Sequence, residues 1–391
     1  MKKKIVIIII AVILFISGIL LHNYLRVKYA RIAVILKENL TTPFLSEVKV
    51  SDFIGSLNGN IIDDYTIDTT EIGEKEVAFD FINDDNIKVS YTYTINVVDV
   101  IEPTIWLGDT YNVEVNSDID LATKILCGDD YDDTPKCYIE GDYDLNQVGQ
   151  YDLVYKAEDS SGNKEEKAFT LNVKEPSEKT KKETTYTYYQ DVINKYKNEN
   201  NKIGIDISSF QGDIDFSKLK AAGVEFIIIR VGYGYDNKNF LDKKFKEYIE
   251  GANKENIPVG VYYYSYASSL KEAKDQAKWV IKQIKDYKVT LPVVFDWEEW
   301  NNYNEYHLSF FGLTSMAEEF LDYVTSKEYK GMLYSSAKYL ENIWMKTKYD
   351  IWLAQYNENV TYEGDYKIWQ LCDDGKVDGI DTAVDIDILF E

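Results

Sequence analysis

The octapeptide Leu291-Pro-Val-Val-Phe-Asp296-Trp-Glu298 places two carboxyl groups directly after a short apolar run. A run of this length that opens with proline is typical of a buried strand. Because side chains alternate faces along a strand, Asp296 and Glu298 project to the same side. Crowding raises the pKa of one of two such carboxyls, which gives an enzyme both a proton donor and an anion at neutral pH. The alternative is that both residues cap the next helix.

Apolar runs and amphipathic stretches alternate from Ile203 onward. The apolar runs predict strands at 203–207, 225–231, 257–264, 290–297, 330–335, 350–355, 366–371 and 384–388. The amphipathic stretches predict helices at 240–255, 268–287 and 307–327. Alternating strands and helices imply a parallel sheet, and this many strands favour closure into a barrel. We therefore expect residues 202–391 to form an irregular α/β (TIM-like) barrel whose later crossovers are loops.

Polar side chains gather where the predicted strands end, and in such barrels the active site lies at the C-terminal ends of the strands. The candidate catalytic residues are four acids: Asp206, Asp296, Glu298 and Asp385. The candidate substrate-binding residues are Tyr233, Tyr262, Tyr264, Tyr334, Gln355 and Gln370. A single acid such as Asp206 is explained as a helix cap, but a purely structural barrel does not need so many acids at one end.

The composition argues against several kinds of chemistry. A net charge of −24 argues against nucleic acid as a partner, because binding it requires a basic surface. His22 and His307 are the only histidines, which argues against a Ser-His-Asp triad or a His-rich zinc site. The three cysteines lack a metal-ligand spacing. We expect no cofactor and no metal ion, and chemistry that depends on carboxylates.

Several motifs in this region together resemble the glycoside hydrolase family 25 lysozymes. They are Asp206-x-Ser-x-x-Gln211-Gly-x-Ile214-Asp215-Phe, Phe226-Ile-Ile-Ile-Arg230-Val-Gly-Tyr-Gly, Pro258-Val-Gly-Val-Tyr-Tyr-Tyr-Ser, the octapeptide 291–298, Trp369-Gln and Val384-Asp385-Ile-Asp387. The resemblance covers residues 203–391 in order. It implies an N-acetylmuramidase that hydrolyses the β-1,4 bond between N-acetylmuramic acid and N-acetylglucosamine in peptidoglycan. Glu298 would be the general acid, Asp296 would assist, and Asp206 and Asp385 would hold the site and tune its pKa values.

The chain departs from the family pattern at a few positions. Tyr263 stands where a histidine is common, Asp387 where an asparagine is common, and Leu371-Cys372 where an aromatic residue is usual. None of these positions is one of the four candidate acids. The departures therefore bear on substrate affinity rather than on activity.

Two other functions stay open on the sequence alone. One is a chitinase-like glycosidase, because Asp378-Gly-Ile-Asp-Thr-Ala-Val-Asp-Ile-Asp superficially resembles an Asp-Gly-x-Asp-x-Asp-x-Glu strand, although its final glutamate is missing. The other is a non-catalytic wall-binding or adhesion protein whose barrel acts as a lectin. The complete set of acids argues against the second alternative.

The N-terminus carries three lysines, Lys2 to Lys4, followed by an apolar segment from Ile5 to Leu21 without a charge. This length is near the lower limit for spanning a bilayer. A cleaved signal peptide is the alternative, but no small-x-small cleavage site follows. We expect residues 1–22 to form a cytoplasmic tip and a transmembrane signal-anchor. The chain would then be a single-pass protein of the cell membrane, with its catalytic domain outside and facing the cell wall.

Two segments in the middle of the chain align without a gap at a separation of 76 residues, 72–99 and 148–175. Both end in alternating strands, and the second contains the turn Asp159-Ser-Ser-Gly-Asn163. The second copy resembles the bacterial immunoglobulin-like modules of surface proteins. We therefore expect two all-β immunoglobulin-like sandwiches, at 40–101 and 102–175, followed by a polar linker at 176–201.

Three local features of the middle region leave alternatives. Cys127 and Cys137 form a disulfide or stay two buried thiols, and export favours the disulfide. Cys372 is expected to be an isolated core thiol. The acidic run 129–133 could bind calcium, although a solvated loop is the expectation. The expected partners are peptidoglycan glycan strands and, through the N-terminal helix, the membrane; the sequence does not tell which proteins, if any, bind the chain.

Overall fold

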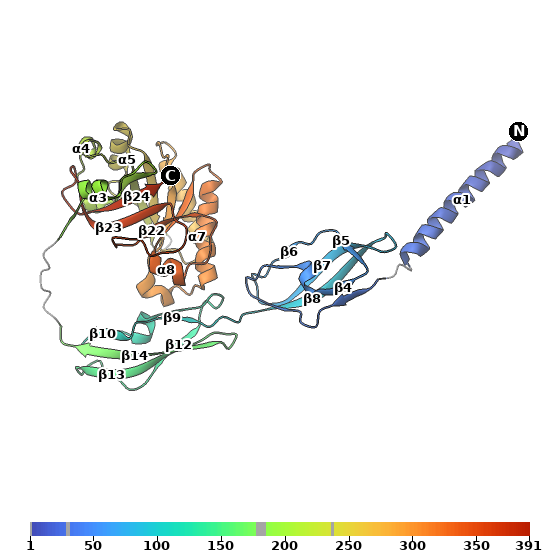
Figure 1. Cartoon of the computed structure of the whole chain (residues 1–391), viewed down its shortest axis with the longest axis horizontal. Coiled ribbons are helices and arrows are strands. Elements are labelled where there is room, and N and C mark those ends of the chain that lie inside the picture. Colours follow the sequence, from blue (N-terminus) through green and yellow to red (C-terminus); the bar gives the residue numbers. More distant parts are fainter. Residues whose placement is uncertain (1, 29–31, 177–184, 236–237) are drawn as a thin grey trace. The chain divides into compact units, whose positions relative to one another are not determined.

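The computed structural model describes residues 2–28, 32–176, 185–235 and 238–391, with the backbone alone at 2–11 and 235. The chain divides into two compact units, Met1–Val100 and Ile101–Glu391. Each unit has its own helices and its own β-sheets (Figure 1).

The N-terminal unit consists of one helix, α1 (Lys2–Lys28), followed mostly by strands. A four-stranded sheet has the order β2-β8-β7-β5, and two further pairs are β1–β4 and β3–β6. The bounds of these elements are β1 Val34–Leu36, β2 Thr41–Pro43, β3 Val48–Lys49, η1 Val50–Phe53, β4 Ile54–Leu57, β5 Gly59–Ile61, β6 Thr66–Ile67, β7 Gly73–Asn83 and β8 Lys88–Val98.

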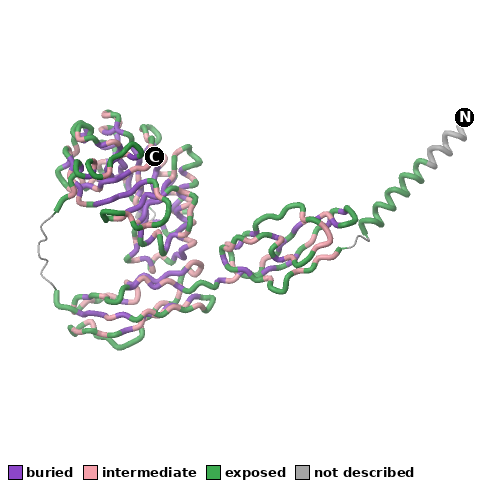
Figure 2. Tube along the Cα trace, viewed as in Figure 1, coloured by how far each residue is buried: buried purple, intermediate pink, exposed green. Residues whose placement is uncertain are grey.

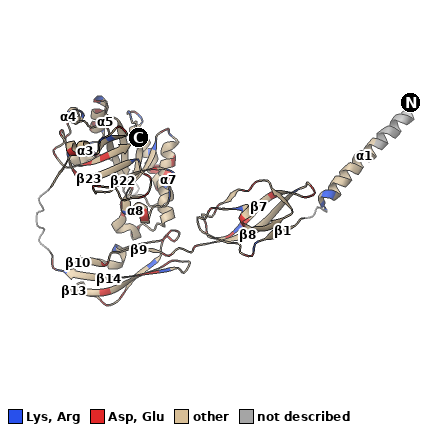
Figure 3. Cartoon of the chain, viewed as in Figure 1, with Lys and Arg blue, Asp and Glu red and all other residues tan. Residues whose placement is uncertain are grey.

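No helix in the described part of the chain is long and apolar enough to cross a membrane. Between Val12 and Leu21, the side chains described in α1 are apolar except for the hydroxyl group of Ser17. His22 follows them, and basic residues occupy the last turn, as Figure 3 shows. The transmembrane helix predicted as part of the fold class is therefore wrong for the described residues, and the side chains of Ile5–Ala11 lie outside them.

The second unit begins with a β-rich module, residues 102–175, called here the second β module. Its four-stranded sheet has the order β10-β14-β13-β12, and β11 pairs with β9. The element bounds are β9 Thr104–Trp106, β10 Thr110–Glu114, α2 Leu121–Lys124, β11 Leu126–Gly128, β12 Lys136–Glu140, β13 Gly149–Glu158 and β14 Lys164–Lys174. A separate hydrophobic core, with Leu153, Tyr155 and Leu171 at its centre, holds the module together.

The internal repeat corresponds to two long antiparallel hairpins. Strands β7 and β8 form the first, and β13 and β14 form the second with the same 76-residue offset. The remaining strands have two to five residues, because turns interrupt the chain around them. Besides its four-stranded sheet, each of the two regions has only two-stranded pairs among the described residues. The β content was predicted correctly, but the prediction of two complete immunoglobulin-like sandwiches is wrong.

The rest of the second unit is a closed barrel of eight strands. Their order is β23-β22-β21-β20-β19-β17-β16-β24, and pairing of β23 with β24 closes the ring. The strand bounds are β16 Asn201–Ile207, β17 Ile227–Tyr235, β19 Val259–Tyr264, β20 Val293–Asp296, β21 Gly331–Ser336, β22 Asp350–Ala354, β23 Ile368–Lys376 and β24 Val384–Phe390. All eight overlap the strands predicted from the sequence.

Strand β24 runs antiparallel to both of its neighbours, whereas the other strand pairs of the ring are parallel. Only residues 377–383 connect β23 to β24. A parallel crossover needs about a dozen residues, so a connection this short forces the chain to turn back. The irregularity of the predicted barrel therefore lies in its last strand.

Helices cover the outside of the barrel (Figure 1), and buried residues concentrate in it (Figure 2). The helix predicted at 268–287 is α6, which Ser269 caps and whose Ala273, Ala277, Val280 and Ile284 are buried. The last crossovers contain only short α8 or no helix, as expected. The remaining bounds are β15 Thr187–Tyr188, α3 Tyr189–Tyr196, η2 Ser209–Gln211, α4 Phe216–Ala221, β18 Lys238–Leu241, α5 Phe245–Lys254, α6 Leu270–Ile284, η3 Trp300–Glu305, α7 Phe310–Thr325 and α8 Ala337–Asn342.

The range predicted as a linker contains ordered structure at its C-terminal end. Strand β15 pairs with β23, and Tyr189 and Val192 of α3 belong to the hydrophobic core of the barrel. Residues 177–184 of this range lie outside the described residues. The predicted domain boundaries stay a prediction.

Candidate active site

A pocket of about 280 Å³ opens where the parallel strands of the barrel end. Side chains alternate between the two faces of each strand, and this alternation explains which residues line the pocket. Val294 belongs to a core cluster formed by several strands, while Val293 and Phe295 pack in the larger cluster that includes the helices. Asp296 shares the face of Val294, so its carboxyl group enters the pocket. Trp297 has the opposite orientation and is fully buried.

All four candidate acids line this pocket. Asp296 is the last residue of β20, and Glu298 follows two positions later. Asp206 on β16 lies directly opposite Asp385 on β24 in the strand register. The structure thus gathers acids from three strands that are far apart in the sequence.

The four acids differ in exposure. Asp206 and Asp296 are both only 4% exposed, whereas Asp385 is half-buried and Glu298 is exposed at the pocket mouth. A ligand entering the pocket therefore reaches Glu298 directly. Asp296 is buried deeper in the pocket, so it can contact only the part of a ligand that reaches that depth.

Burial is the main cause that raises the pKa of both Asp296 and Glu298. Burial raises the pKa of Asp296 well above its usual value, and the nearby Glu298 carboxyl raises it further. The pocket walls displace water from Glu298 and raise its pKa as well. Two adjacent carboxyls with raised pKa values retain a shared proton at pH values where isolated carboxyls are ionised.

The acids on β16 and β24 form a second crowded group. Burial raises the pKa of Asp206 well above its usual value, and Asp385 and Asp387 raise it further. Burial and the neighbouring Asp373 raise the pKa of Asp385 to about 7. Asp387 is fully buried, and its Oδ1 accepts a hydrogen bond of 2.9 Å from Nε1 of Trp352. This group therefore also binds protons near neutral pH.

Gln370 fixes the position of Asp206 through a chain of hydrogen bonds. The Nε2 of Gln370 donates to Oδ2 of Asp206 at 2.8 Å. The hydroxyl groups of Tyr334 and Tyr356 both donate to Oε1 of Gln370 at 2.9 Å. Both tyrosines have a pKa raised by burial, so they remain donors. The network leaves the amide of Gln370 with a single orientation.

Arg230 supplies a positive charge to the pocket. Its guanidinium contacts Asp242, with Nε donating to Oδ2 at 2.8 Å and Nη2 at 2.7 Å from the same oxygen. The ring of Phe210, which is 77% exposed, lies 5.0 Å from the guanidinium carbon. Arg230 partly offsets the rise in the pKa of Asp296. The charge therefore limits how strongly Asp296 holds a proton.

The structure brings four of the six candidate substrate-binding residues to the pocket, namely Tyr262, Tyr264, Tyr334 and Gln370. Tyr233 is not among the lining residues and stacks on Phe240, with ring centroids 5.3 Å apart. Gln355 is also absent from the lining. Its amide Nε2 donates to Oγ1 of Thr361 and its Oε1 accepts from the Thr361 N–H, so it holds the loop after β22 instead.

Sequence reasoning missed several lining residues. Phe210 and Gln211 lie inside the quoted Asp206 motif, and Arg230 lies inside the quoted strand motif, so these positions could have been found. Tyr356 directly follows Gln355, and Asp373 lies where β23 bends away from regular pairing with β24. Only the bulge and the loop after β22 bring these last two to the pocket, and neither has a sequence signature.

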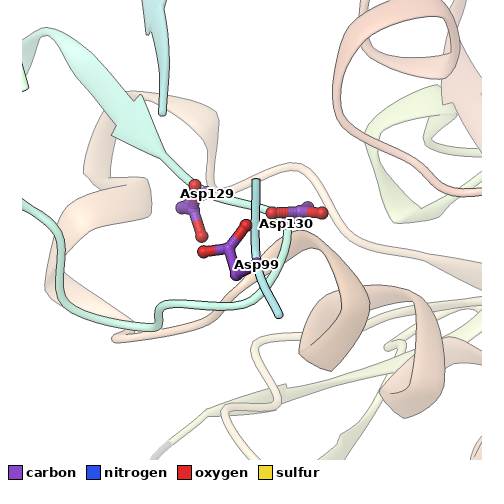
Figure 4. Close-up of side chains that lie close together, drawn as sticks. All are labelled: Asp99, Asp129 and Asp130. Atoms are coloured by element: carbon purple, nitrogen blue, oxygen red, sulfur yellow. The ribbon is translucent and has the colours of Figure 1, made fainter. Parts of the chain in front are cut away.

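The acidic run 129–133 lies in the second β module, after β11 (Figure 4). Asp129 is fully buried, and its Oδ1 accepts hydrogen bonds from the N–H groups of Tyr131 and Asp132 at 2.9 and 2.7 Å. The expected solvated loop is therefore wrong at Asp129. Cys127 and Cys137 of the same module are joined by a disulfide, and Cys372 is a buried free thiol in the barrel.

Comparisons with known proteins concern this C-terminal part. The family described as "Glycosyl hydrolases family 25" matches residues 205–380. The autolytic lysozyme of Clostridium acetobutylicum is 26% identical over 191 residues, which cover 48% of this chain and 56% of that protein. The chain thus spans little more than half the length of that relative.

Two solved structures are similar at low overall superposition. The modular autolysin LytC from Streptococcus pneumoniae, in complex with a synthetic peptidoglycan ligand, is 25% identical, with a TM-score of 0.45 and coverage of 61% of this chain and 56% of that chain. A family 25 glycosyl hydrolase from Bacillus anthracis is 25% identical, with a TM-score of 0.43 and coverage of 50% and 92%. The family match and the lysozyme relative confirm the resemblance seen in the sequence, and residues 205–380 of this chain are a glycosyl hydrolase family 25 domain.

Proposed function

We propose that the chain is an exported N-acetylmuramidase that hydrolyses the β-1,4 bond between N-acetylmuramic acid and N-acetylglucosamine in peptidoglycan. The observation that carries this proposal is the pair Asp296 and Glu298 at the end of β20, one buried and one exposed in the same pocket. Glycoside hydrolysis requires an acid that protonates the leaving oxygen and an anion that meets positive charge at the anomeric carbon.

Glu298 fits the role of general acid, because it is exposed to an incoming sugar and its pKa is raised. A bound glycan would displace more water from its carboxyl group and raise the pKa further. Asp296 fits the assisting role from below, either by orienting the acetamido group of the substrate or by stabilising positive charge directly. Asp206 and Asp385 hold this pair in a crowded acidic environment that keeps protons near neutral pH.

The exposed aromatic rim supports a sugar polymer as the substrate. Phe210 and Tyr356 are 77% and 50% exposed beside the acids, and aromatic faces stack on the apolar faces of sugar rings. The disulfide between Cys127 and Cys137 supports a site of action outside the cytoplasm, because disulfides persist in oxidising compartments. We therefore place the catalytic domain on the side of the cell wall.

Substitution of the proposed acid tests this function. Glu298→Gln retains the shape of the side chain but removes the proton, so we expect at least about a hundredfold loss of muropeptide release from purified peptidoglycan. Mass analysis should show new reducing-end N-acetylmuramic acid with the wild type. Glu341→Gln is the matched control, because Glu341 is an exposed glutamate of the same barrel and does not line the pocket.

Three results would contradict the proposal. Equal release by Glu298→Gln and the wild type would remove Glu298 from the chemistry. Binding of peptidoglycan without release by either protein would favour a lectin. Faster cleavage of chitin oligomers than of peptidoglycan would instead indicate the chitinase-like alternative.

A further inference from the structure

The second β module contacts the barrel at the segment that follows Glu298. This segment, residues 299–311, contains η3 and the start of α7. The N–H of Trp300 donates to the carbonyl oxygen of Glu298 at 2.8 Å, so η3 begins one hydrogen bond away from the proposed acid. Any element that fixes η3 therefore also fixes the backbone of Glu298.

Asn304 of η3 joins the barrel to the module through both ends of its amide. Its Nδ2 donates to the carbonyl oxygen of Ile125 at 3.0 Å. Its Oδ1 accepts from the N–H of Cys127 at 3.1 Å. These bonds continue the edge of β11, which Cys127 also ties to Cys137 through the disulfide. One side chain of the barrel thus completes the backbone pairing of a strand in the module.

Charged and backbone contacts surround this amide. Nζ of Lys124 lies 2.9 Å from Oε1 of Glu305 and 3.0 Å from Oδ1 of Asn302. Downstream, the N–H of Phe310 donates to the carbonyl oxygen of Asp129 at 2.8 Å. The module therefore contacts the segment at both of its ends.

Apolar packing closes the same interface. Leu126 of the module belongs to the hydrophobic core of the barrel. Gly128 lies against Phe310, where an added Cβ would approach Cε1 of the ring to 2.5 Å. A flexible tether would not require such a close fit. The fit indicates a fixed docking of the module on this segment.

A stack of aromatic rings leads from the module to the residue before Glu298. Trp106 of the module lies 5.7 Å from Tyr339, and Tyr339 stacks on Trp300 with ring centroids 3.9 Å apart. Trp300 then meets Trp297 edge-on at 4.9 Å, and Nε1 of Trp297 donates to the carbonyl oxygen of Ala267. Trp300 is only 8% exposed, so packing rather than sugar stacking accounts for its position.

We propose that the second β module is part of the active-site scaffold, and that Asn304 is a positioning residue that holds the Glu298 backbone through η3. This inference rests on the proposed function, because it assigns a consequence for catalysis to an interface. The module then fixes the position of the proposed acid, rather than only separating the barrel from the rest of the chain. Displacement of a reacting group by about 1 Å can cost on the order of a hundredfold in rate.

The test uses the full chain with Asn304→Ala and the control Asn301→Ala. Asn301 lies on the same short helix but is exposed to solvent. For Asn304→Ala, we expect kcat per folded molecule on purified peptidoglycan to fall about tenfold or more with little change in KM. The alkaline limb of its pH profile should move to lower pH, because a looser segment lets more water surround the Glu298 carboxyl group and so lowers its raised pKa. Asn301→Ala should match the wild type in all three quantities.

Hydrogen exchange supplies a readout that does not depend on activity. The backbone amides of the 299–311 segment should exchange faster in Asn304→Ala than in Asn301→Ala. Equal kcat, pH profile and exchange in the two variants would overturn the inference. If the wild type itself releases no muropeptides, the proposed function fails. The exchange result then decides alone whether the module braces the segment.

Discussion

Replacement of Asp385 by asparagine should stabilise the barrel at alkaline pH and leave its stability unchanged at acidic pH. Asp385 is half-buried in the pocket, and burial raises its pKa from 3.8 to about 7. A carboxyl whose pKa is higher in the folded state contributes stability below its unfolded pKa. That contribution is lost as the pH rises through the folded pKa. The loss therefore falls between about pH 4 and pH 7, and asparagine, which carries no ionisable proton, avoids it.

The size of the effect follows from the difference between the two pKa values. About 3 pKa units, each worth roughly 1.4 kcal/mol, set an upper value of about 4 kcal/mol in the free energy of unfolding. Solvent screens part of this cost because the side chain is only half-buried, so we expect about 2 kcal/mol at pH 8. Near pH 4 the neutral acid and the amide should give nearly equal stability.

Urea unfolding at pH 4, 6 and 8, followed by tryptophan fluorescence, measures this difference. Six of the seven tryptophans lie in the barrel, so the signal reports mainly on the domain that holds Asp385. Asp378→Asn is the control, because Asp378 is an exposed acid shortly before β24. A pH-independent difference between Asp385→Asn and the wild type would refute the reasoning, as would a decrease in the stability of the variant at pH 8.

Two further substitutions test the second β module. Gly128→Ala should lower the free energy of unfolding by about 1–3 kcal/mol, because the added Cβ meets the ring of Phe310. Gly108→Ala, where the nearest atom to the added Cβ is the Thr110 carbonyl oxygen at 3.9 Å, should have little effect in the same urea titration. The double variant Cys127→Ser/Cys137→Ser should cost about 3 kcal/mol, because the disulfide closes a short loop in the unfolded chain. Thermal unfolding with and without reductant checks this, and an unchanged midpoint for the variant would contradict it.

The barrel could be predicted because its strands carry their own signal. Each is a short apolar run bounded by turn residues, and β20 even shows its two faces through Phe295 and Asp296. The 76-residue repeat likewise predicted both long hairpins, because their alternation of apolar and polar residues is regular. Local periodicity was sufficient to predict a strand or helix wherever that element buries one face along its whole length.

The short strands before each hairpin could not be derived in the same way. Pairs such as β3 with β6 contain two residues each, too few for any periodicity to appear. Their pairing depends on contacts between segments distant in the sequence. Resemblance of the longer hairpins to a known module therefore suggested a complete second sheet that these segments do not form.

Within the site, the sequence was sufficient to locate the acids. It did not determine which way the side chain of every neighbouring residue points. Gln370 and Gln355 both end predicted strands, yet only Gln370 reaches Asp206, because Gln355 bonds to Thr361 in its own loop. The choice depends on the path of the loop after β22. Residues at a strand end can be predicted to lie near a site, but their orientation follows from the loop that receives them.

The interface between the second β module and the barrel lay furthest from sequence reasoning, and its chemistry explains why. Most of its module-side hydrogen-bonding partners are backbone groups, namely the carbonyl oxygens of Ile125 and Asp129 and the N–H of Cys127. Every residue has such groups, so no motif marks them. Asn304, whose side chain bonds the groups of Ile125 and Cys127, has no feature in the sequence that sets it apart from the other asparagines of η3. Position thus gives this asparagine its importance, since it lies between a strand edge that needs pairing and the loop that carries Glu298.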